Sequence, residues 1–387
     1  MPTALIIDHG ASRAALAGAR ALAAAGWRVH IGSPSPATIA SASRSVARVR
    51  HVPGPEGGLD PFVAAVAGAV AEDGVELVLP SDDHQLLGLS MRRADVGALV
   101  PYAPHDVVVR ATDKLELHGA AERVGLGSPS TAEATDEEIA RWSWPAMVKP
   151  RLHFPMVRQD APAHLPVRRV SSREHALEAA AEIRRAGGEP LIQEPIDGAH
   201  MSVTAVADSG GRVVACLQQC TPRLYPATAG ISARAYTLPV DAQLLGKIER
   251  LLAELGWMGL VQLQFRARRG DALRLIDFNG RLYGSLALGL HAGVNLPAAW
   301  ADVARGRPVT GQVRGRAGAR YQWFEGDVRG ALDEGVGVPR SVAGALAFAA
   351  RSGHSMWDPR DPGPAMRVTL DIARRAARRR RGARSSG

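Results

Sequence analysis

The first hundred residues alternate between short apolar runs and amphipathic segments. The runs ALIID, RVHIGS and VELVLP predict strands, because each is short, apolar and followed by polar or glycine residues. The alanine-rich residues 12–25 and the segment after Ser81 have a helical pattern. Strands that alternate with helices form a parallel sheet, so residues 3–101 predict an open α/β unit.

Two turns of this unit carry polar residues at the ends of predicted strands. Residues 8–13 form a first turn that is poorer in glycine than a dinucleotide-binding fingerprint, so we do not predict an NAD site there. Residues 81–84 follow VELVLP, and their carboxylates are suited to capping the next helix.

Downstream, the pattern becomes mixed. After a polar linker, Asp113 and Lys114 open a helix, and the strand PAMVKP carries Lys149 near its end, which predicts a smaller α+β unit over residues 111–194. Residues 195–305 combine the strands MSVTAVAD and RVVACLQQ, a helix over 241–255 and a hairpin. A proline- and glycine-punctuated extension follows, and no internal repeat is found.

The hairpin holds the most informative polar residues. The run GLVQLQFR is followed by a turn at residues 268–271 and by the run LRLIDFNGR. Residues Asp277, Asn279 and Arg281 are spaced two apart, and in an extended strand they share one face. The hairpin would place Gln264 beside Asp277 and Asn279.

Three oxygen donors beside a guanidinium suit a magnesium ion and a phosphoryl group, so this pattern points to ATP chemistry. An ordinary edge strand with a solvated polar face is the alternative for the triplet taken alone.

Composition narrows the class of protein. The chain has 387 residues and is 46% hydrophobic, which is typical of a folded protein with two or three domains. No run of eighteen apolar residues and no basic region before an apolar start is present, so we expect a cytoplasmic protein without a membrane span. Cys216 and Cys220 lack a second pair and are expected to be buried thiols.

The net charge of +9 comes mostly from one end. Seven arginines between residues 374 and 384 supply seven of these charges, which leaves +2 for the body of the chain. Such a run is typical of a solvated helix end, although a tail that binds nucleic acid or an anionic lipid surface stays open as an alternative.

The ordered set of motifs resembles the ATP-grasp superfamily, including the ATP-binding fold of the carbamoyl-phosphate synthase large chain. The set consists of Asp113-Lys114, the strand end at Lys149, the segment LIQEPI, Gln264-Phe265 and DFNGR at 277–281. The resemblance extends from residue 3 to about residue 300. It implies an N-terminal parallel α/β domain followed by two α+β lobes that enclose a nucleotide.

The resemblance implies specific roles for these residues. Two lysines would reach the triphosphate, a hinge between the lobes would contact adenine, three oxygen donors would hold Mg²⁺ or Mn²⁺, and Arg281 would act in catalysis. The nucleotide contacts would be Lys114, Lys149, Gln193, Glu194, Ile196 and His200, with His200 as a ribose contact or an ordinary structural histidine. The metal ligands would be Gln264, Asp277 and Asn279.

The chain departs from the family pattern at the metal site. Relatives usually have Glu-Phe where this chain has Gln264-Phe265, and Glu-x-Asn-Pro-Arg where it has residues 277–281. The site would therefore carry one carboxylate, which magnesium bound to ATP still tolerates.

Two loops match the family pattern less closely. Residues 151–155 and the basic pair Arg168-Arg169 replace a glycine-rich phosphate flap, so side chains would supply the positive charge. Arg223, Gly230 and Arg234 resemble the loop that faces the acceptor substrate.

We therefore expect four parts: residues 1–110, 111–194, 195–305 and 306–387. The predicted function is an ATP-dependent ligase that activates a small carboxylic acid as an acyl phosphate and transfers it to an amine or thiol. A non-catalytic ATP-binding or regulatory protein is the second interpretation, and a nucleic-acid or membrane module built on the arginine tail is the third. A homodimer is possible.

Overall fold

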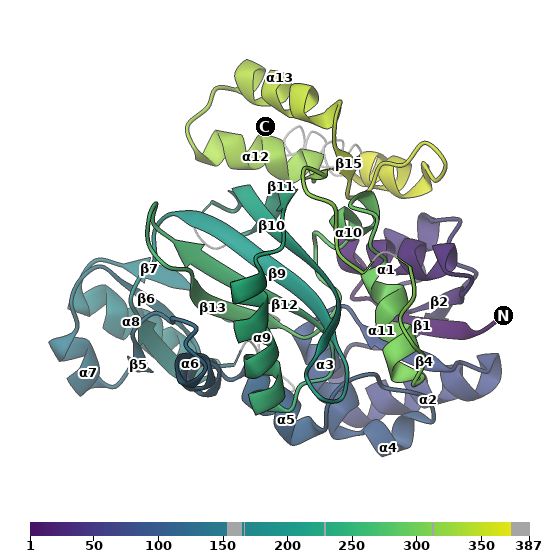
Figure 1. The fold of residues 1–387 in the computed structure, drawn as a ribbon, viewed down its shortest axis with the longest axis horizontal. Helices are drawn as coiled ribbons and strands as arrows, with labels where there is room; N and C mark the ends of the chain where they lie inside the picture. The colour runs from purple at the N-terminus through teal and green to yellow at the C-terminus, as the bar shows by residue number, and fades with distance from the viewer. Residues whose placement is uncertain (153–164, 166, 228–229, 312, 373–387) are drawn as a thin grey trace, which may run out of the picture.

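The computed structural model describes residues 1–152, 165, 167–227, 230–311 and 313–372. Three sheets make up the described chain, and Figure 1 shows the largest of them between the other two. The predicted arginine tail lies outside the described residues.

The N-terminal unit is the predicted parallel α/β sheet, with strand order β3-β2-β1-β4. Ser12 accepts a hydrogen bond from Ala15 N and begins α1 where the sequence pattern predicts it, because a side-chain oxygen satisfies an otherwise unpaired helix amide. The elements are β1 (Thr3–Ile7), α1 (Arg13–Ala24), β2 (Arg28–Ser33), β3 (Arg48–His51), α2 (Leu59–Asp73), β4 (Leu77–Pro80), α3 (Asp83–Met91), α4 (Arg93–Val96) and α5 (His105–Thr112).

A small antiparallel sheet, which we call the small sheet, follows with strand order β5-β8-β6-β7. Asp113 caps the helix that Lys114 begins, as the sequence predicts. The elements are α6 (Lys114–Arg123), β5 (Thr131–Glu133), α7 (Asp136–Arg141), β6 (Ala146–Pro150), β7 (Arg168–Val170), α8 (Arg173–Arg185) and β8 (Pro190–Gln193).

The third sheet, the large sheet, has the order β13-β12-β9-β10-β11-β14-β15. Its pairs are antiparallel except β14 with β15. Its elements are β9 (Ala199–Ala207), β10 (Val213–Tyr225), β11 (Ile231–Leu238), α9 (Ala242–Leu255), β12 (Gly259–Ala267), β13 (Arg274–Asn279), α10 (Ala287–His291), α11 (Leu296–Ala304), β14 (Arg320–Gln322), α12 (Phe324–Asp333), α13 (Val338–Ala349) and β15 (Gly353–His354).

The large sheet contains more of the chain than residues 195–305, the range predicted for it from the sequence. β14 and β15 come from the predicted C-terminal extension, so residues after 305 complete the large sheet instead of lying outside it. The division into four parts stays a prediction.

One apolar core joins the N-terminal unit to the large sheet. It contains Ile6 and Leu16 of the first together with Leu263, Leu282 and Trp300 of the second. The small sheet packs α7 and α8 onto a separate core. Because close-packed cores resist shear, we expect the first two units to behave as one body and the small sheet as another.

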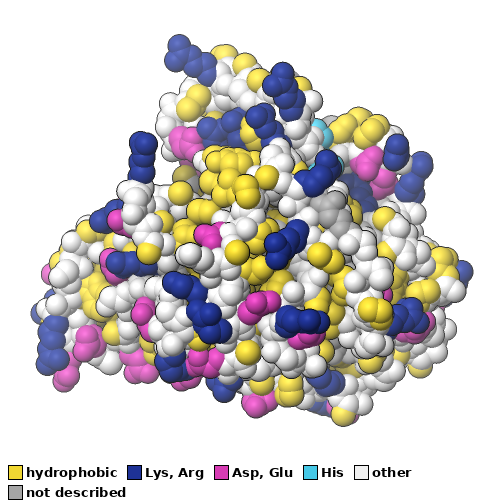
Figure 2. Space-filling model, viewed as in Figure 1, with side chains coloured by type: hydrophobic (Ala, Val, Ile, Leu, Met, Phe, Trp, Pro, Cys, Tyr) yellow, Lys and Arg dark blue, Asp and Glu magenta, His cyan; other side chains and the backbone are white. Residues whose placement is uncertain are grey.

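Charged side chains do not gather into one basic patch on the face drawn in Figure 2, where Lys and Arg are interspersed with Asp and Glu. No helix in the described part of the chain is both long and apolar enough to cross a membrane.

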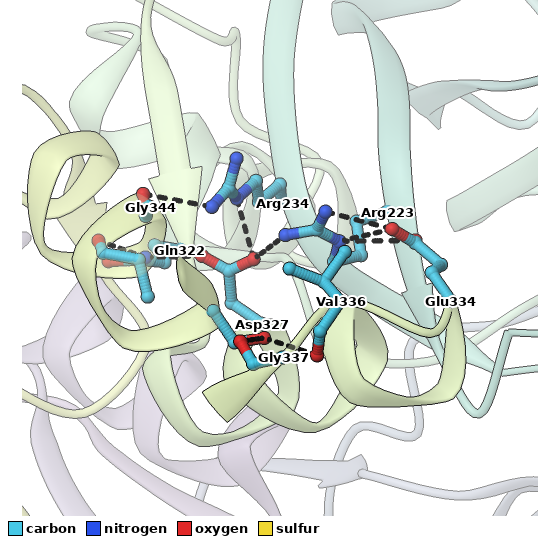
Figure 3. Close-up of polar contacts among 10 residues, drawn as sticks. Arg223, Arg234, Gln322, Asp327, Glu334, Val336, Gly337 and Gly344 are labelled. Atoms are coloured by element: carbon cyan, nitrogen blue, oxygen red, sulfur yellow. Dashed lines mark hydrogen bonds and ion pairs between the residues drawn. The ribbon is translucent and has the colours of Figure 1, made fainter. Parts of the chain in front are cut away.

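A buried acid ties the C-terminal helices to the large sheet (Figure 3). Asp327 of α12 is fully buried and pairs with Arg223 of β10 at 2.7 Å and with Arg234 of β11 at 2.6 Å. Gln322 donates to the same carboxylate at 2.6 Å. Glu334 pairs with Arg223 at 2.8 Å, so two carboxylates neutralise two arginines at this junction.

We predict that Asp327→Asn lowers the free energy of unfolding by about 3 kcal/mol, because removing one partner of a buried ion pair leaves the other charges uncompensated. Urea denaturation would measure the change. Asp271→Asn, in the exposed turn between β12 and β13, is the matched control and should leave stability unaltered. Equal stability of the two variants would show that the Asp327 network contributes little.

Candidate active site

The predicted hairpin forms between β12 and β13, and its register brings two of the expected oxygen donors together. Gln264 lies directly opposite Asp277, and Gln262 lies opposite Asn279. Directly paired side chains in an antiparallel sheet lie about 5 Å apart at Cβ, so the amide and the carboxylate share one face. β13 is the edge strand of the large sheet, as the alternative interpretation expected, but its polar face is not solvated, because Asn279 is buried and Asp277 is half-buried.

Arg281 differs from its predicted position. β13 ends at Asn279, so Arg281 lies beyond the strand that was expected to carry it. Its guanidinium contacts Asn279 Oδ1 at 2.9 Å and both carboxylate oxygens of Asp83 at 3.1 Å. A Cβ at Gly280 would lie 2.3 Å from the Trp257 ring, so the packing here requires glycine.

The partner Asp83 was missed by sequence analysis as a contact of the site. Asp82 accepts a hydrogen bond from Gln85 N and caps α3, as predicted for this turn. The neighbouring Asp83 holds Arg281 from the N-terminal unit. No local pattern in the sequence indicates a pair of residues separated by 198 positions.

A cavity of about 210 Å³ lies between the small sheet and the large sheet. It brings together every predicted site residue except Asn279 and Arg281. The described residues that line it are Lys114, Met147, Lys149, Val167, Arg169, Gln193, Glu194, Pro195, Ile196, His200, Leu224, Gly230, Gln264, Arg266, Ile276 and Asp277.

Two buried lysines face this cavity from α6 and β6. Lys149 Nζ donates to Ile276 O at 3.4 Å, and Lys114 Nζ donates to Arg151 O at the same distance. Burial, followed by the charge of Lys114, lowers the pKa of Lys149 to about 7. Burial also lowers the pKa of Lys114, although Asp277 opposes that shift. A site with two poorly solvated ammonium groups is suited to an anionic ligand.

His118 of α6 lies close enough to Lys149 and Lys114 to be affected by their charges, and the sequence did not identify it as a site residue. Burial and the charges of Lys149 and Lys114 lower its pKa to about 3, so its imidazole is neutral. Its Nδ1 lies 3.1 Å from Thr131 Oγ1, and the same hydroxyl accepts from Gln193 Nε2 at 2.7 Å. This chain of contacts orients the side chain of Gln193 at the end of β8.

The predicted hinge begins where β8 ends. Glu194 N donates to Ser130 O at 2.9 Å, and the Glu194 carboxylate pairs with Arg274 at 2.6 Å. Arg266 of β12 donates to Ile196 O at 3.4 Å. The segment is thus connected to both sheets, which fits a hinge, while its role toward adenine stays a prediction.

His200 lies on β9, next to the metal-donor pair. Its Nε2 lies 3.4 Å from Gln264 Oε1, and it is 7% exposed. Burial and the charge of Arg266 lower its pKa to about 4.

The predicted acceptor loop and the predicted phosphate flap each place some residues at the cavity and others away from it. Of the predicted acceptor loop, Gly230 lines the cavity, whereas Arg223 and Arg234 are held by Asp327 on α12. Among the basic residues expected at the flap, Arg169 lines the cavity and pairs with Asp197, while Arg168 pairs with Glu182.

The flap residues 151–155 are described in part. Arg151 pairs with Asp113, at the capped start of α6. Residues 153–155 lie outside the described residues. Cys216 is buried, as predicted, and Cys220 is partly exposed.

Sequence comparisons find two matches. Residues 188–327 match a family model described as "ATP-grasp in the biosynthetic pathway with Ter operon". The chain is 27% identical over 212 residues to the carbamoyl phosphate synthase large chain of Deinococcus deserti, and the match covers 50% of this chain and 19% of that protein. The chain therefore spans a small part of the length of this relative.

Structural comparisons find the same fold in ligases and carboxylases. An L-amino acid ligase from Bacillus licheniformis has a TM-score of 0.60 at 14% identity, with 79% of this chain and 74% of that chain covered. A biotin carboxylase from Campylobacter jejuni has a TM-score of 0.63 at 13% identity, with 82% and 74% covered. The fold class inferred from the sequence is thereby confirmed, and the family-model match confirms the resemblance to the ATP-grasp superfamily over residues 188–327.

We predict that the stability of the ligand-free protein depends on pH through Lys149. Between pH 7 and its ordinary value of 10.5, the unfolded chain keeps a proton that the folded chain has lost, so stability rises with pH over this range. In Lys149→Met this contribution is absent. The difference in unfolding free energy between wild type and Lys149→Met should therefore favour wild type more at pH 9 than at pH 6, as measured by urea denaturation.

Lys247 of α9 provides the matched control, since it lies outside the cavity lining. For Lys247→Met the same difference should be constant with pH. A constant difference for Lys149→Met as well would mean that Lys149 keeps its ordinary pKa.

Proposed function

We propose that this chain, an ATP-grasp protein by its fold and by the match of its central residues, is an ATP-dependent ligase. It would activate a small carboxylic acid as an acyl phosphate and transfer the acyl group to an amine or thiol. The observation that carries the proposal is the cavity between the two sheets, where two buried lysines face Gln264 and Asp277.

The cavity has the two regions that a nucleotide needs. Met147, Val167, Ile196 and Ile276 supply apolar surface for a purine ring, and the hinge supplies backbone amide and carbonyl groups. Lys114 and Lys149 would bind the triphosphate as point charges. Phosphate oxygens would also lower the cost of keeping both ammonium groups charged.

The donors in the cavity fit a divalent cation bound together with phosphate. Gln264 and Asp277 offer an amide oxygen and a carboxylate on paired strands. Asn279 is a weaker candidate, because its Oδ1 accepts from Arg281. When bound, magnesium would neutralise phosphate charge during transfer.

In such a reaction the protein forms no covalent bond to the substrates and acts by positioning them and stabilising charge. A carboxylate oxygen of the acid attacks the γ-phosphorus of ATP, and ADP leaves; the amine or thiol then attacks the acyl carbon, and phosphate leaves. Lys114 and Lys149 would hold the phosphates in line. Arg281, oriented by Asp83, would counter negative charge on the transferred group and on the tetrahedral oxyanion.

The names of the relatives support the class of reaction but not the substrate. One structural relative is an L-amino acid ligase, and others are carboxylases, so the acid and the nucleophile differ among proteins of this fold. An ADP-release screen of the purified protein against panels of acids and amines, with product detected by mass, tests the proposal directly.

We predict that Asp277→Asn, Lys149→Met and Arg281→Ala each lower the rate of ADP formation by about 100- to 1000-fold, because each removes a charge that acts on the phosphoryl group. Circular dichroism would establish that the variants fold. Lys247→Met is the control and should keep the wild-type rate. Normal turnover by folded Asp277→Asn would exclude the assigned phosphate and metal site.

A regulatory ATP-binding protein is the second candidate function. The observation that favours it is Gln264, a carboxamide at a position where relatives usually have a carboxylate, together with the hydrogen bond from Arg281 to Asn279 Oδ1. Such a protein would bind ATP in calorimetry and release no ADP with any acid and acceptor in the screen.

A further inference from the structure

Arg13 begins α1 after the turn that follows β1, and it is the most buried arginine in the described part of the chain. The turn lies where the strand order β3-β2-β1-β4 changes direction, because β2 and β4 flank β1. Open α/β sheets bind ligands outside the carboxyl ends of their strands at such a switch point. Arg13 therefore occupies a place in the fold where ligands commonly bind.

The guanidinium of Arg13 is held by residues that come much later in the chain. Its Cζ lies 3.8 Å from the centroid of the Trp323 ring, and its Nη1 donates to Tyr321 Oη at 2.9 Å. Tyr321 Oη donates in turn to Gly284 O at 2.8 Å. These contacts fix the plane of the guanidinium, and its Nε and Nη2 have no hydrogen-bond partner among the described residues. Two such donors on one edge match a carboxylate or a phosphate.

No acid balances the charge of Arg13. Among the described residues, no carboxylate lies within ion-pairing distance of its guanidinium, whereas the less buried Arg281 pairs with Asp83. Asp8 in the preceding turn is also buried, but its Oδ1 accepts from two backbone amides of that turn. Arg13 is thus a buried cation whose contacts in the described chain are an indole ring and a hydroxyl.

Two effects make this charge unfavourable in the ligand-free protein. A buried charge without a partner has lost hydration that nothing replaces, and stacking on the Trp323 ring offsets only part of that loss. The first turn of α1 also contains no acidic residue, so Arg13 places a cation at the positive end of a helix dipole. A bound anion would reverse both effects.

We propose that Arg13 binds an anionic group of the acid substrate, which therefore carries a second carboxylate or a phosphate besides the carboxylate that is phosphorylated. This inference rests on the ligase activity proposed above. Gly284, whose carbonyl is part of the Arg13 contacts, follows Arg281 by three residues, so their Cα atoms are at most about 11 Å apart. Leu282 N donates to Pro80 O at 3.3 Å, which holds this loop at the end of β4. One short acid could reach both arginines.

Matched acids test the assignment in the ADP-release assay with ATP, magnesium and the panel of amines. Each dicarboxylate or phosphonocarboxylate is paired with an acid of equal length that has a single carboxylate, such as succinate with butyrate. Arg13→Gln removes the charge and keeps a polar side chain. Arg28→Gln, at an exposed position at the start of β2, is the matched control, and circular dichroism establishes folding.

Wild type should form ADP with acids that carry two anionic groups and not with their partners. Arg13→Gln should raise KM for the acid about ten- to a hundredfold, because a charge-assisted contact is lost, and change kcat less. KM for ATP and for the nucleophile should stay constant. Equal turnover of the paired acids by wild type, an unchanged acid KM in folded Arg13→Gln, or a change in the nucleophile KM instead would overturn the proposal. The preference of wild type decides the question even where Arg13→Gln does not fold.

Calorimetric titration with succinate, glutarate and inorganic phosphate, in the absence of ATP, separates this proposal from the ligase function. Binding that is lost in Arg13→Gln, with no ADP formed from any acid, keeps the anion site and refutes the ligase function. ADP formation from acids with a single carboxylate, unaffected by Arg13→Gln, keeps the ligase function and refutes the role of Arg13. If neither binding nor ADP formation is found, both fail.

Discussion

The two lysine ammonium groups in the cavity are held where water is nearly excluded, and the rest of the site is arranged around that constraint. Lys114 is 3% exposed and Lys149 is 6% exposed, and they also repel each other. Asp277 opposes the loss of charge on both. Among the described residues, the lining has four cationic side chains and two carboxylates, namely Lys114, Lys149, Arg169 and Arg266 against Glu194 and Asp277. The ligand-free cavity therefore has an excess of positive charge that a polyphosphate would neutralise.

Local features of the fold were predictable because their causes are local. Ser12, Asp113 and Asp241 are capping residues that mark the start of a helix within one or two positions. The hairpin followed from a glycine-containing turn between two apolar runs, and its register determined that Gln264 faces Asp277. The composition also distinguishes the lysines. Only three of the 47 lysine and arginine residues are lysines, and two of these three line the cavity.

What the sequence did not predict depends on partners that are far apart in the chain. Tyr321 in β14 pairs with Ala235 in β11, so residues beyond position 305 complete the large sheet although no periodicity identifies a three-residue strand. The spacing that placed Arg281 on the strand assumed that β13 continues, yet β13 ends at Asn279 and Arg281 pairs with Asp83 of the N-terminal unit. Tertiary contacts of this kind override local pattern.

The two sides of the cavity belong to different apolar cores, and this division bears on how the site would bind a ligand. The oxygen donors and Arg281 belong to the body formed by the N-terminal unit and the large sheet, whereas Lys149 and Gln193 belong to the small sheet, which has its own core. A cavity between two bodies is complete only when they are close, because the ammonium of Lys149 and the carboxylate of Asp277 come from different bodies. An anion bound between them lowers the repulsion within the cavity, and this favours the closed arrangement over an open one.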